Sequence, residues 1–190
     1  MSMKKINFAE VKELAEVAGD ALGLRKDQII IDAINAGYDS TNMKFGTTNT
    51  ALTIDTLISA TTALDDNGVP SDERYFIHAA KQKADLLKTT QVTSADYNSV
   101  KALVNGEINT FLGLKFICIA KRDEGGLPVS GNDVTGFIYH KRAVGFALGQ
   151  EVQTEMSWVA ERGAWIVGGD FSAGAVVIDD KGIAGVISKA

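Results

Sequence analysis

The stretch Leu64-Asp65-Asp66-Asn67-Gly68-Val69-Pro70, followed by Arg74-Tyr75-Phe76-Ile77-His78, decides how this chain is interpreted. Apolar residues at helical spacing lead into Leu64, and Asn67-Gly68 has the chemistry of a turn that ends a helix. Pro70 lacks the N–H that a further helical turn requires, so the helix stops before it. The aromatic and β-branched run over 74–78 then predicts a strand. The remaining elements are placed outward from this helix, turn and strand.

Two helices are predicted before the turn. Asn7 and Glu10 have the spacing of a capping box, and apolar residues then recur at helical spacing. Two interior glycines weaken this segment, so one long kinked helix over 8–37 and two abutting helices both satisfy the pattern. Thr53 is the expected N-cap of the second helix, which runs to the turn.

Further elements are expected on both sides of the 74–78 strand. In chain order they are a polar loop or exposed edge strand over 38–51, helices over 79–88 and 94–104, a buried central strand over 114–120, a strand over 135–140 and a helical turn over 141–148. Shorter strands over 151–158, 164–167, 175–178 and 183–187 follow, separated by glycines. Alternation over 151–158 places Val152, Met156 and Trp158 on one face. The architecture that follows is α+β with interleaved elements.

Composition excludes several classes of protein. With 45% hydrophobic and 23% charged residues, the chain lies in the ordinary globular range. Its net charge of −5 supplies no general cationic field, which disfavours sequence-blind binding of nucleic acid. The single cysteine forms no internal disulfide, and no stretch approaches the ~18 apolar residues of a membrane span. We therefore expect a soluble, intracellular protein with neither a membrane nor a specific nucleic-acid sequence as partner.

The residues that carry catalytic chemistry are sparse. His78 and His140 each lie inside a predicted strand, where a structural histidine is the usual case. Cys118 lies among apolar residues and is expected to be a buried, inert thiol. The run Asp65-Asp66-Asn67-Gly68 lacks the alternating ligands and distal glutamate of a calcium loop. We accordingly predict no catalytic residues, no cofactor and no metal.

Several stretches resemble the major capsid proteins of tailed phages, which have the Hong Kong 97-type fold. They are the segment Ala18 to Ile34, the helix and turn Leu57 to Pro70, the strand Arg74 to Ile77, Leu86-Leu87, Gly106 through Phe116, and His140 to Val144. The similarity covers roughly residues 10 to 187, and it rests on the order of these segments. It implies an α+β fold with a spine helix over 8–37, an axial lobe over 72–130 and a peripheral sheet from 38–71 and 131–187. As domains, this divides the chain into 1–71, 72–130 and 131–190, joined in one compact unit.

By the same resemblance, the chain is a structural virion protein that associates laterally with copies of itself and is no enzyme. Its expected partners are its own copies or a full-length capsid protein, with a scaffolding protein as a further candidate. Its expected location is the virion, and the host cytoplasm before assembly. Charged helix residues are the candidate subunit contacts: Glu10, Lys12, Glu13, Arg25, Lys26 and Asp27.

The resemblance has one departure. Family members carry an N-terminal arm and a long β-hairpin before the spine helix, whereas only seven residues precede the first helix here. This predicts a truncated chain or a naturally reduced relative, and loss of such arms is expected to cost assembly more than folding. Two alternatives stay open: a reduced capsid relative that co-assembles with or interferes with a full-length protein, and a ligand-binding or enzymatic α+β domain.

Overall fold

The computed structural model describes residues 8–88, 110–120 and 125–190. The helices are α1 (Phe8–Gly37), α2 (Ile54–Asp66) and α3 (Ala80–Lys88), with short 3₁₀ turns η1 (Lys141–Ala143) and η2 (Asp180–Gly182). The strands are β1 (Lys44–Phe45), β2 (Arg74–His78), β3 (Thr110–Phe111), β4 (Leu114–Cys118), β5 (Val129–Ser130), β6 (Asp133–His140), β7 (Val144–Val159), β8 (Ala164–Val177) and β9 (Ile183–Lys189). The predicted helix over 94–104 and the cap at Asn7 lie outside the described residues.

The structure decides between the two predictions for the first helix. It is a single helix of 30 residues. A Cβ added at Gly19 or Gly23 would meet nothing within 4 Å, so both glycines lie where no close approach requires them. Their cost is therefore only the intrinsic one of about 1 kcal/mol each, which packing elsewhere on the helix offsets.

A mixed sheet forms the centre of the molecule. Its strand order is β1-β9-β6-β2-β4-β3, and β5 pairs with β6. The β2–β4 and β1–β9 pairs are parallel, and the other pairs are antiparallel. Because the sheet takes strands from all three predicted ranges of the chain, the predicted elements are indeed interleaved.

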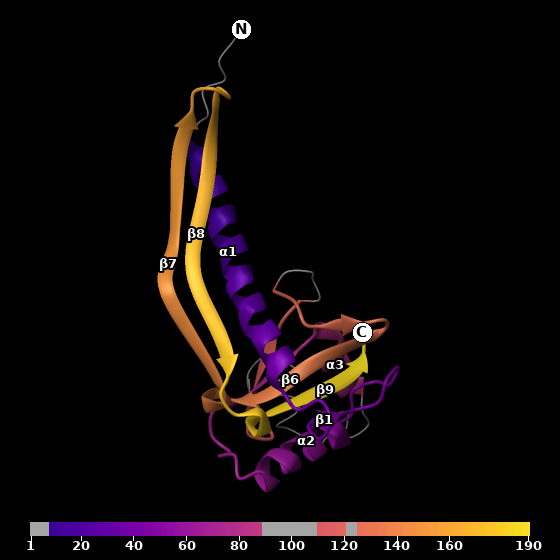
Figure 1. The fold of residues 1–190 in the computed structure, drawn as a ribbon. Helices are drawn as coiled ribbons and strands as arrows, with labels where there is room; N and C mark the ends of the chain where they lie inside the picture. The colour runs from indigo at the N-terminus through magenta and orange to yellow at the C-terminus, as the bar shows by residue number, and fades with distance from the viewer. Residues whose placement is uncertain (1–7, 89–109, 121–124) are drawn as a thin grey trace.

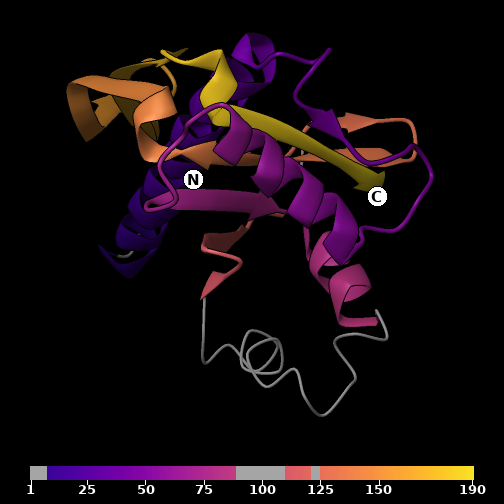
Figure 2. The same ribbon diagram turned by 90° about the horizontal axis from the view of Figure 1, so that it is seen from below.

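Helices cover the two faces of this sheet (Figures 1 and 2). On one face, α2 and α3 bury Leu57, Leu64 and Leu86 against Phe76 and other strand residues. On the opposite face, the C-terminal half of α1 buries Ile31 and Ile34 against β6 and β9 residues such as Phe137 and Ile183. The result is three layers with a separate hydrophobic core on each side of the sheet.

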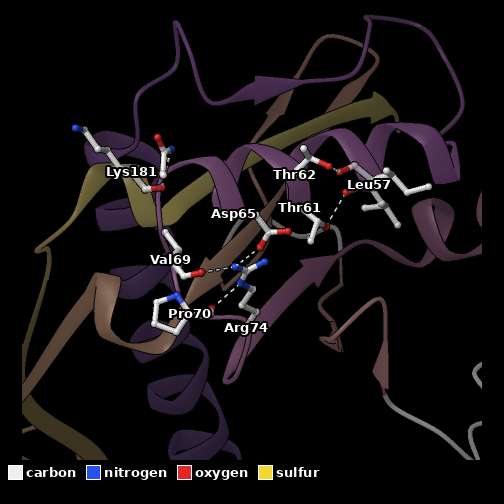
Figure 3. A network of polar contacts seen from close by, with 10 residues as sticks. Leu57, Thr61, Thr62, Asp65, Val69, Pro70, Arg74 and Lys181 are labelled. Carbon is white, nitrogen blue, oxygen red and sulfur yellow. Dashed lines mark hydrogen bonds and ion pairs between the residues drawn. The ribbon is translucent and has the colours of Figure 1, made fainter.

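The turn over residues 65–70, which ends α2, is held by a buried arginine. Thr53 caps α2 as predicted, and the helix ends at Asn67 and Gly68, the latter at φ 73°. Arg74 is only 2% exposed. Its Nε donates to the Pro70 carbonyl at 2.7 Å, and its Nη2 donates to Asp65 Oδ1 at 2.7 Å and to the Val69 carbonyl (Figure 3). The guanidinium thus ties the end of α2 to the start of β2.

The last third of the chain departs from the predicted short strands. β7 and β8 are 16 and 14 residues long and pair as a two-stranded ribbon, with irregularities between Leu148 and Gln153. The predicted strands over 164–167 and 175–178 are therefore parts of one strand, and the glycines between them do not interrupt it. The predicted helical turn over 141–148 is limited to the three residues of η1. The ribbon leaves the sheet and runs beside α1 (Figure 1).

The prediction of a buried central strand over 114–120 is wrong. β4 pairs with β2 on one side and with the two-residue strand β3 on the other, whereas β6 and β2 occupy the centre. Leu114 is buried, but Lys115 and Ile117 point to the opposite, exposed face. Cys118 is exposed as well, because the strand ends there beyond the cover of the core.

Candidate assembly surface

Helix α1 packs onto the ribbon mainly through β8 and makes fewer contacts with β7. A Cβ on Gly169 would lie 2.6 Å from Leu22 Cδ1, and a Cβ on Gly37 would lie 2.6 Å from Val177 Cγ2. Between them, the Lys26 ammonium lies 5.7 Å from the centre of the Phe171 ring. The helix residues are spaced at multiples of a helical turn, so one stripe of α1 follows β8 along its length. Glycine at 169 and at 37 permits this close approach.

The other strand, β7, is left uncovered on the same face. Phe146 and Leu148 pair in register with Ala175 and Ala173 of β8, so all four side chains point toward the side where α1 lies. The two alanines are half-buried, whereas Phe146 is 43% exposed and Leu148 41% exposed. The ribbon therefore presents large apolar side chains beside α1 that nothing described in this chain covers.

We call residues 8–37 and 144–177 together the helix–ribbon lobe. Of the twelve large hydrophobic side chains found exposed in the described residues, seven belong to this lobe. They are Leu14, Val17, Phe146, Leu148, Trp158, Ile166 and Val176. The lobe thus exposes more large apolar side chains than the remainder of the described chain.

The lobe is also the acidic part of the molecule. Its sequence holds ten acidic and four basic residues, a net charge of −6, against −5 for the whole chain. The remainder of the chain is therefore close to neutral, with a net charge of +1. This separation gives the molecule two ends of different electrostatic character.

The six predicted contact residues all lie on α1, but they differ in exposure and in the groups they contact. Lys12 pairs with Glu16 at 3.8 Å, but both side chains are so exposed that the pair contributes little to stability. Glu13, Arg25 and Asp27 are exposed. Lys26 instead packs over Phe171 within the chain, and the Glu10 side chain lies outside the described residues. That these residues contact a neighbouring subunit stays a prediction.

The exposed apolar residues of the lobe were not identified as contacts from the sequence. In β7, the alternation that was noted gave a shared face for Val152 and Trp158, but alternation alone does not say whether that face is covered. In α1, the apolar residues that recur at helical spacing include Leu14, which is 51% exposed. The missing information is which strand the helix covers, which is a property of the tertiary structure.

An open groove lies at the foot of the lobe. It has a volume of about 470 Å³ and is lined by Ala33, Ala36, Gly37, Ala175, Val176, Val177, Ile178 and Asp180. Small side chains form most of it, and Val176 is 62% exposed on its rim. It contains one carboxylate and no convergent set of polar groups, unlike a small-molecule site.

The residues with catalytic potential are structural. His78 is 2% exposed, and its Nδ1 lies 3.0 Å from the Ala79 carbonyl oxygen, to which the neutral ring donates. Burial lowers the pKa of His78 below its ordinary value. His140 is equally buried, and its Nδ1 accepts a hydrogen bond from the Arg142 amide as the cap of η1. Each histidine thus forms a hydrogen bond with a backbone group one or two residues away.

Across the described ranges 8–88, 110–120 and 125–190, no three His, Cys, Asp or Glu side chains gather as a metal site. None of the helices in those ranges is both long and apolar enough to cross a bilayer.

Comparison with known proteins gives a consistent result. The chain matches the family model described as "Phage capsid protein" over residues 3–188. No curated protein matches it. Among solved structures it is similar to a chain of Mycobacterium phage Che8, with 18% identity and a TM-score of 0.71 over 92% of this chain. It is also similar to the head structure of Helicobacter pylori bacteriophage KHP40, with 14% identity and a TM-score of 0.71 over 94% of this chain and 69% of that one.

A third neighbour is the SrpI encapsulin complex from Synechococcus elongatus, with 11% identity and a TM-score of 0.64 over 98% of this chain and 68% of that one. This chain spans 61% of the length of the Che8 chain. At these identities the structural likeness establishes the fold, which is the Hong Kong 97-type fold that the order of segments predicted. Because the family match extends over nearly the whole sequence, this chain belongs to the phage capsid protein family.

Proposed function

We propose that this chain is a major-capsid-type subunit that packs laterally against copies of itself to form a closed protein shell. The observation that carries this proposal is the helix–ribbon lobe, in which α1 packs mainly against β8 and leaves large apolar side chains exposed. The exposed Val17, Phe146 and Leu148 have no function in an isolated molecule. They acquire one when a neighbouring subunit covers them.

The physical requirements of a shell agree with this arrangement. A shell subunit needs a rigid body, which the two cores around the mixed sheet supply. It also needs sides that associate reversibly, so that errors are corrected while the shell grows. Partly apolar sides rimmed by charge meet this requirement, because each contact contributes only a modest free energy.

The role is structural and includes no catalytic step. In the full cycle, the chain folds in the host cytoplasm, associates with its copies or with a longer capsid chain, and remains in the virion. A scaffolding protein that guides curvature is a further partner in this proposal.

The test is to purify the chain and follow its association by light scattering and electron microscopy over a range of concentrations. Rings, capsomers or closed particles are the expected result. A strict monomer at every concentration, both alone and mixed with a longer capsid protein, would contradict the proposal.

A further inference from the structure

The acidic lobe requires a contact surface of different character on the next subunit. With a net charge of −6, two lobes repel each other, so a symmetric contact of lobe against lobe is disfavoured. A contact between two different surfaces is heterologous, and repetition of a heterologous contact generates a ring where the rotation closes. The question is which surface lies opposite the lobe. The answer rests on the proposed function.

The free side of the lobe is the first half of α1. Leu14 is 51% exposed and Val17 62% exposed, and both precede Ile31, where α1 is buried against the sheet, by about 20 Å or more along the helix axis. Glu13 and Asp20 flank them and are exposed too. These four residues lie within two helical turns, so they present apolar and acidic groups on adjoining parts of one surface.

One face of the sheet carries the matching chemistry. Tyr75 and Tyr139 pair in register on β2 and β6, and their rings stack with centroids 5.7 Å apart. The Lys115 ammonium lies 5.3 Å from the centre of the Tyr75 ring, and no described carboxylate forms an ion pair with it. Ile117, two residues along β4 on the same face, is 39% exposed. We call Tyr75, Lys115, Ile117 and Tyr139 the tyrosine–lysine patch.

The other exposed apolar side chains outside the lobe fit an acidic partner less well. Ile58 lies one helical turn from Asp55, and Ile178 precedes Asp179 in sequence. Val129 pairs in register with the buried Val134 and has no lysine or arginine as its strand partner. Leu112 is confined to the turn between β3 and β4. The tyrosine–lysine patch combines the exposed Ile117 and two half-buried tyrosine rings with an exposed lysine. Glu73, which forms its ion pair with Lys141, also interacts electrostatically with Lys115, so the positive charge of the patch is partly offset within the chain.

We infer that the tyrosine–lysine patch of one copy receives the first half of α1 from the adjacent copy. In this contact Leu14 and Val17 pack over Ile117 and the tyrosine rings, and the Lys115 ammonium pairs with Glu13 or Asp20. The contact joins two copies and is not made within one. Val17 lies about 25 Å along the helix axis from Ile34, where α1 is buried against its own sheet.

Lysine beside stacked aromatic rings also suits single-stranded nucleic acid. The second copy is favoured because the chain itself carries the complementary acidic and apolar surface, and because its net charge of −5 works against holding phosphates. Binding of nucleic acid is therefore an outcome that the experiment must separate.

The decisive experiment is carbodiimide cross-linking of particles assembled from equal amounts of ¹⁴N- and ¹⁵N-labelled chain. Mass spectrometry of the peptides distinguishes links between copies from links within one copy. We expect a mixed-isotope link from Lys115 to Glu13 or Asp20. Lys141 and Glu73, which pair at 2.9 Å within one chain, supply the internal control because their link should be unmixed.

Particles that show the Lys141–Glu73 link but no mixed link from Lys115 would overturn this contact and leave the shell proposal standing. Failure to form particles at any concentration would contradict both. The two proposals are thus separated by whether assembly occurs.

Charge reversal provides a second test. Lys115→Glu should raise the concentration needed for assembly at least ~10-fold, and adding Glu13→Lys and Asp20→Lys to the same chain should restore it. Lys44→Glu, an exposed lysine on β1 outside the patch, is the matched control and should change nothing. Circular dichroism establishes that each variant is folded. Normal assembly of Lys115→Glu, together with loss of binding to a fluorescent oligothymidine, would assign the patch to nucleic acid and overturn the inference.

Discussion

The sheet and the helix–ribbon lobe differ in how fully their side chains are buried within one chain. Around the sheet, large polar side chains such as Arg74 and Gln82 are buried and form hydrogen bonds to backbone groups. In the lobe, the helix and the ribbon pack along one seam, and seven large apolar side chains stay exposed. One chain thus combines a well-packed sheet with a lobe that keeps several apolar side chains exposed.

Because of this difference, the sheet contributes mainly to the free energy of folding, and the lobe contributes to the free energy of association. Fully burying a valine or leucine side chain contributes about 1.5–3 kcal/mol. In the sheet this contribution is already made within the monomer. In the lobe it becomes available only when another copy covers Val17 or Phe146, so substitutions in the two regions should fail in different measurements.

The largest expected effect comes from truncating matched phenylalanines. Phe137 on β6 is fully buried, and Phe137→Ala should lower the free energy of unfolding by about 3–5 kcal/mol. Phe146 on β7 is 43% exposed, and Phe146→Ala should cost less than about 1 kcal/mol while weakening assembly. Denaturant titration of the unassembled chain and light scattering separate the two quantities. Equal losses of unfolding free energy would break the distinction between sheet and lobe.

A smaller effect is expected at Arg74. Arg74→Met should cost about 2–3 kcal/mol, because it leaves the Pro70 and Val69 carbonyls without their donor at the end of α2. The remaining Asp65 carboxylate is partly exposed and keeps its hydration. Lys141→Met, which removes an exposed ion pair with Glu73, is the control and should not change the midpoint of thermal unfolding measurably. A similar change in both variants would show that the buried guanidinium has no special role.

Local signals allowed this end of α2 to be predicted from the sequence. A cap at Thr53, a glycine turn at Asn67-Gly68 and a proline are short-range features, and each constrains the backbone directly. The burial of Arg74 did not follow from them. An arginine in a strand gives no sign that three acceptors surround it, because two of them belong to the loop that precedes it.

The errors on β4 and β8 have a common physical origin. The apolar run 114–120 and the glycines over 168–174 were interpreted as if each segment determined its own environment. The burial of β4 depends on which layers cover it, and one of its faces has no cover. On β8, glycine at 169 accommodates Leu22 and does not end the strand. The assembly surface escaped prediction for the same reason, since exposure is decided by neighbours that a local pattern does not reveal.

Two of the three glycines of α1, Gly37 and Gly19, provide a sharper test of the seam between helix and ribbon. A Cβ at Gly37 would lie 2.6 Å from Val177 Cγ2 and 2.7 Å from its Cβ, so Gly37→Ala must push the helix away from the ribbon. We expect a loss of about 1–3 kcal/mol. Gly19→Ala meets nothing within 4 Å and should instead stabilise by about 0.5–1 kcal/mol through higher helix propensity.

Thermal unfolding of both alanine variants measures this difference of sign. If Gly37→Ala were as stabilising as Gly19→Ala, the ribbon would not be anchored to the helix at that point. The lobe would then be a looser projection than the contacts indicate.

The smallest expected effect concerns pH and belongs to the sheet side of the comparison. Burial lowers the pKa of His78 below 6.5, and the nearby Lys83 lowers it further, while the bond to Ala79 opposes the shift. Above pH 6.5 the ring is neutral in both the folded and the unfolded chain. As the pH falls below that value, the unfolded chain binds the proton more readily than the folded chain, so stability must decrease.

His78→Asn retains a donor toward the Ala79 carbonyl and should make unfolding less dependent on pH between 7.5 and 5. Denaturant titrations at the two pH values test this, and an unchanged dependence in the variant would exclude His78 as its source. Particles that dissociate in acid while the unassembled chain keeps its full stability would place the pH sensitivity in the contacts between subunits and not in the sheet.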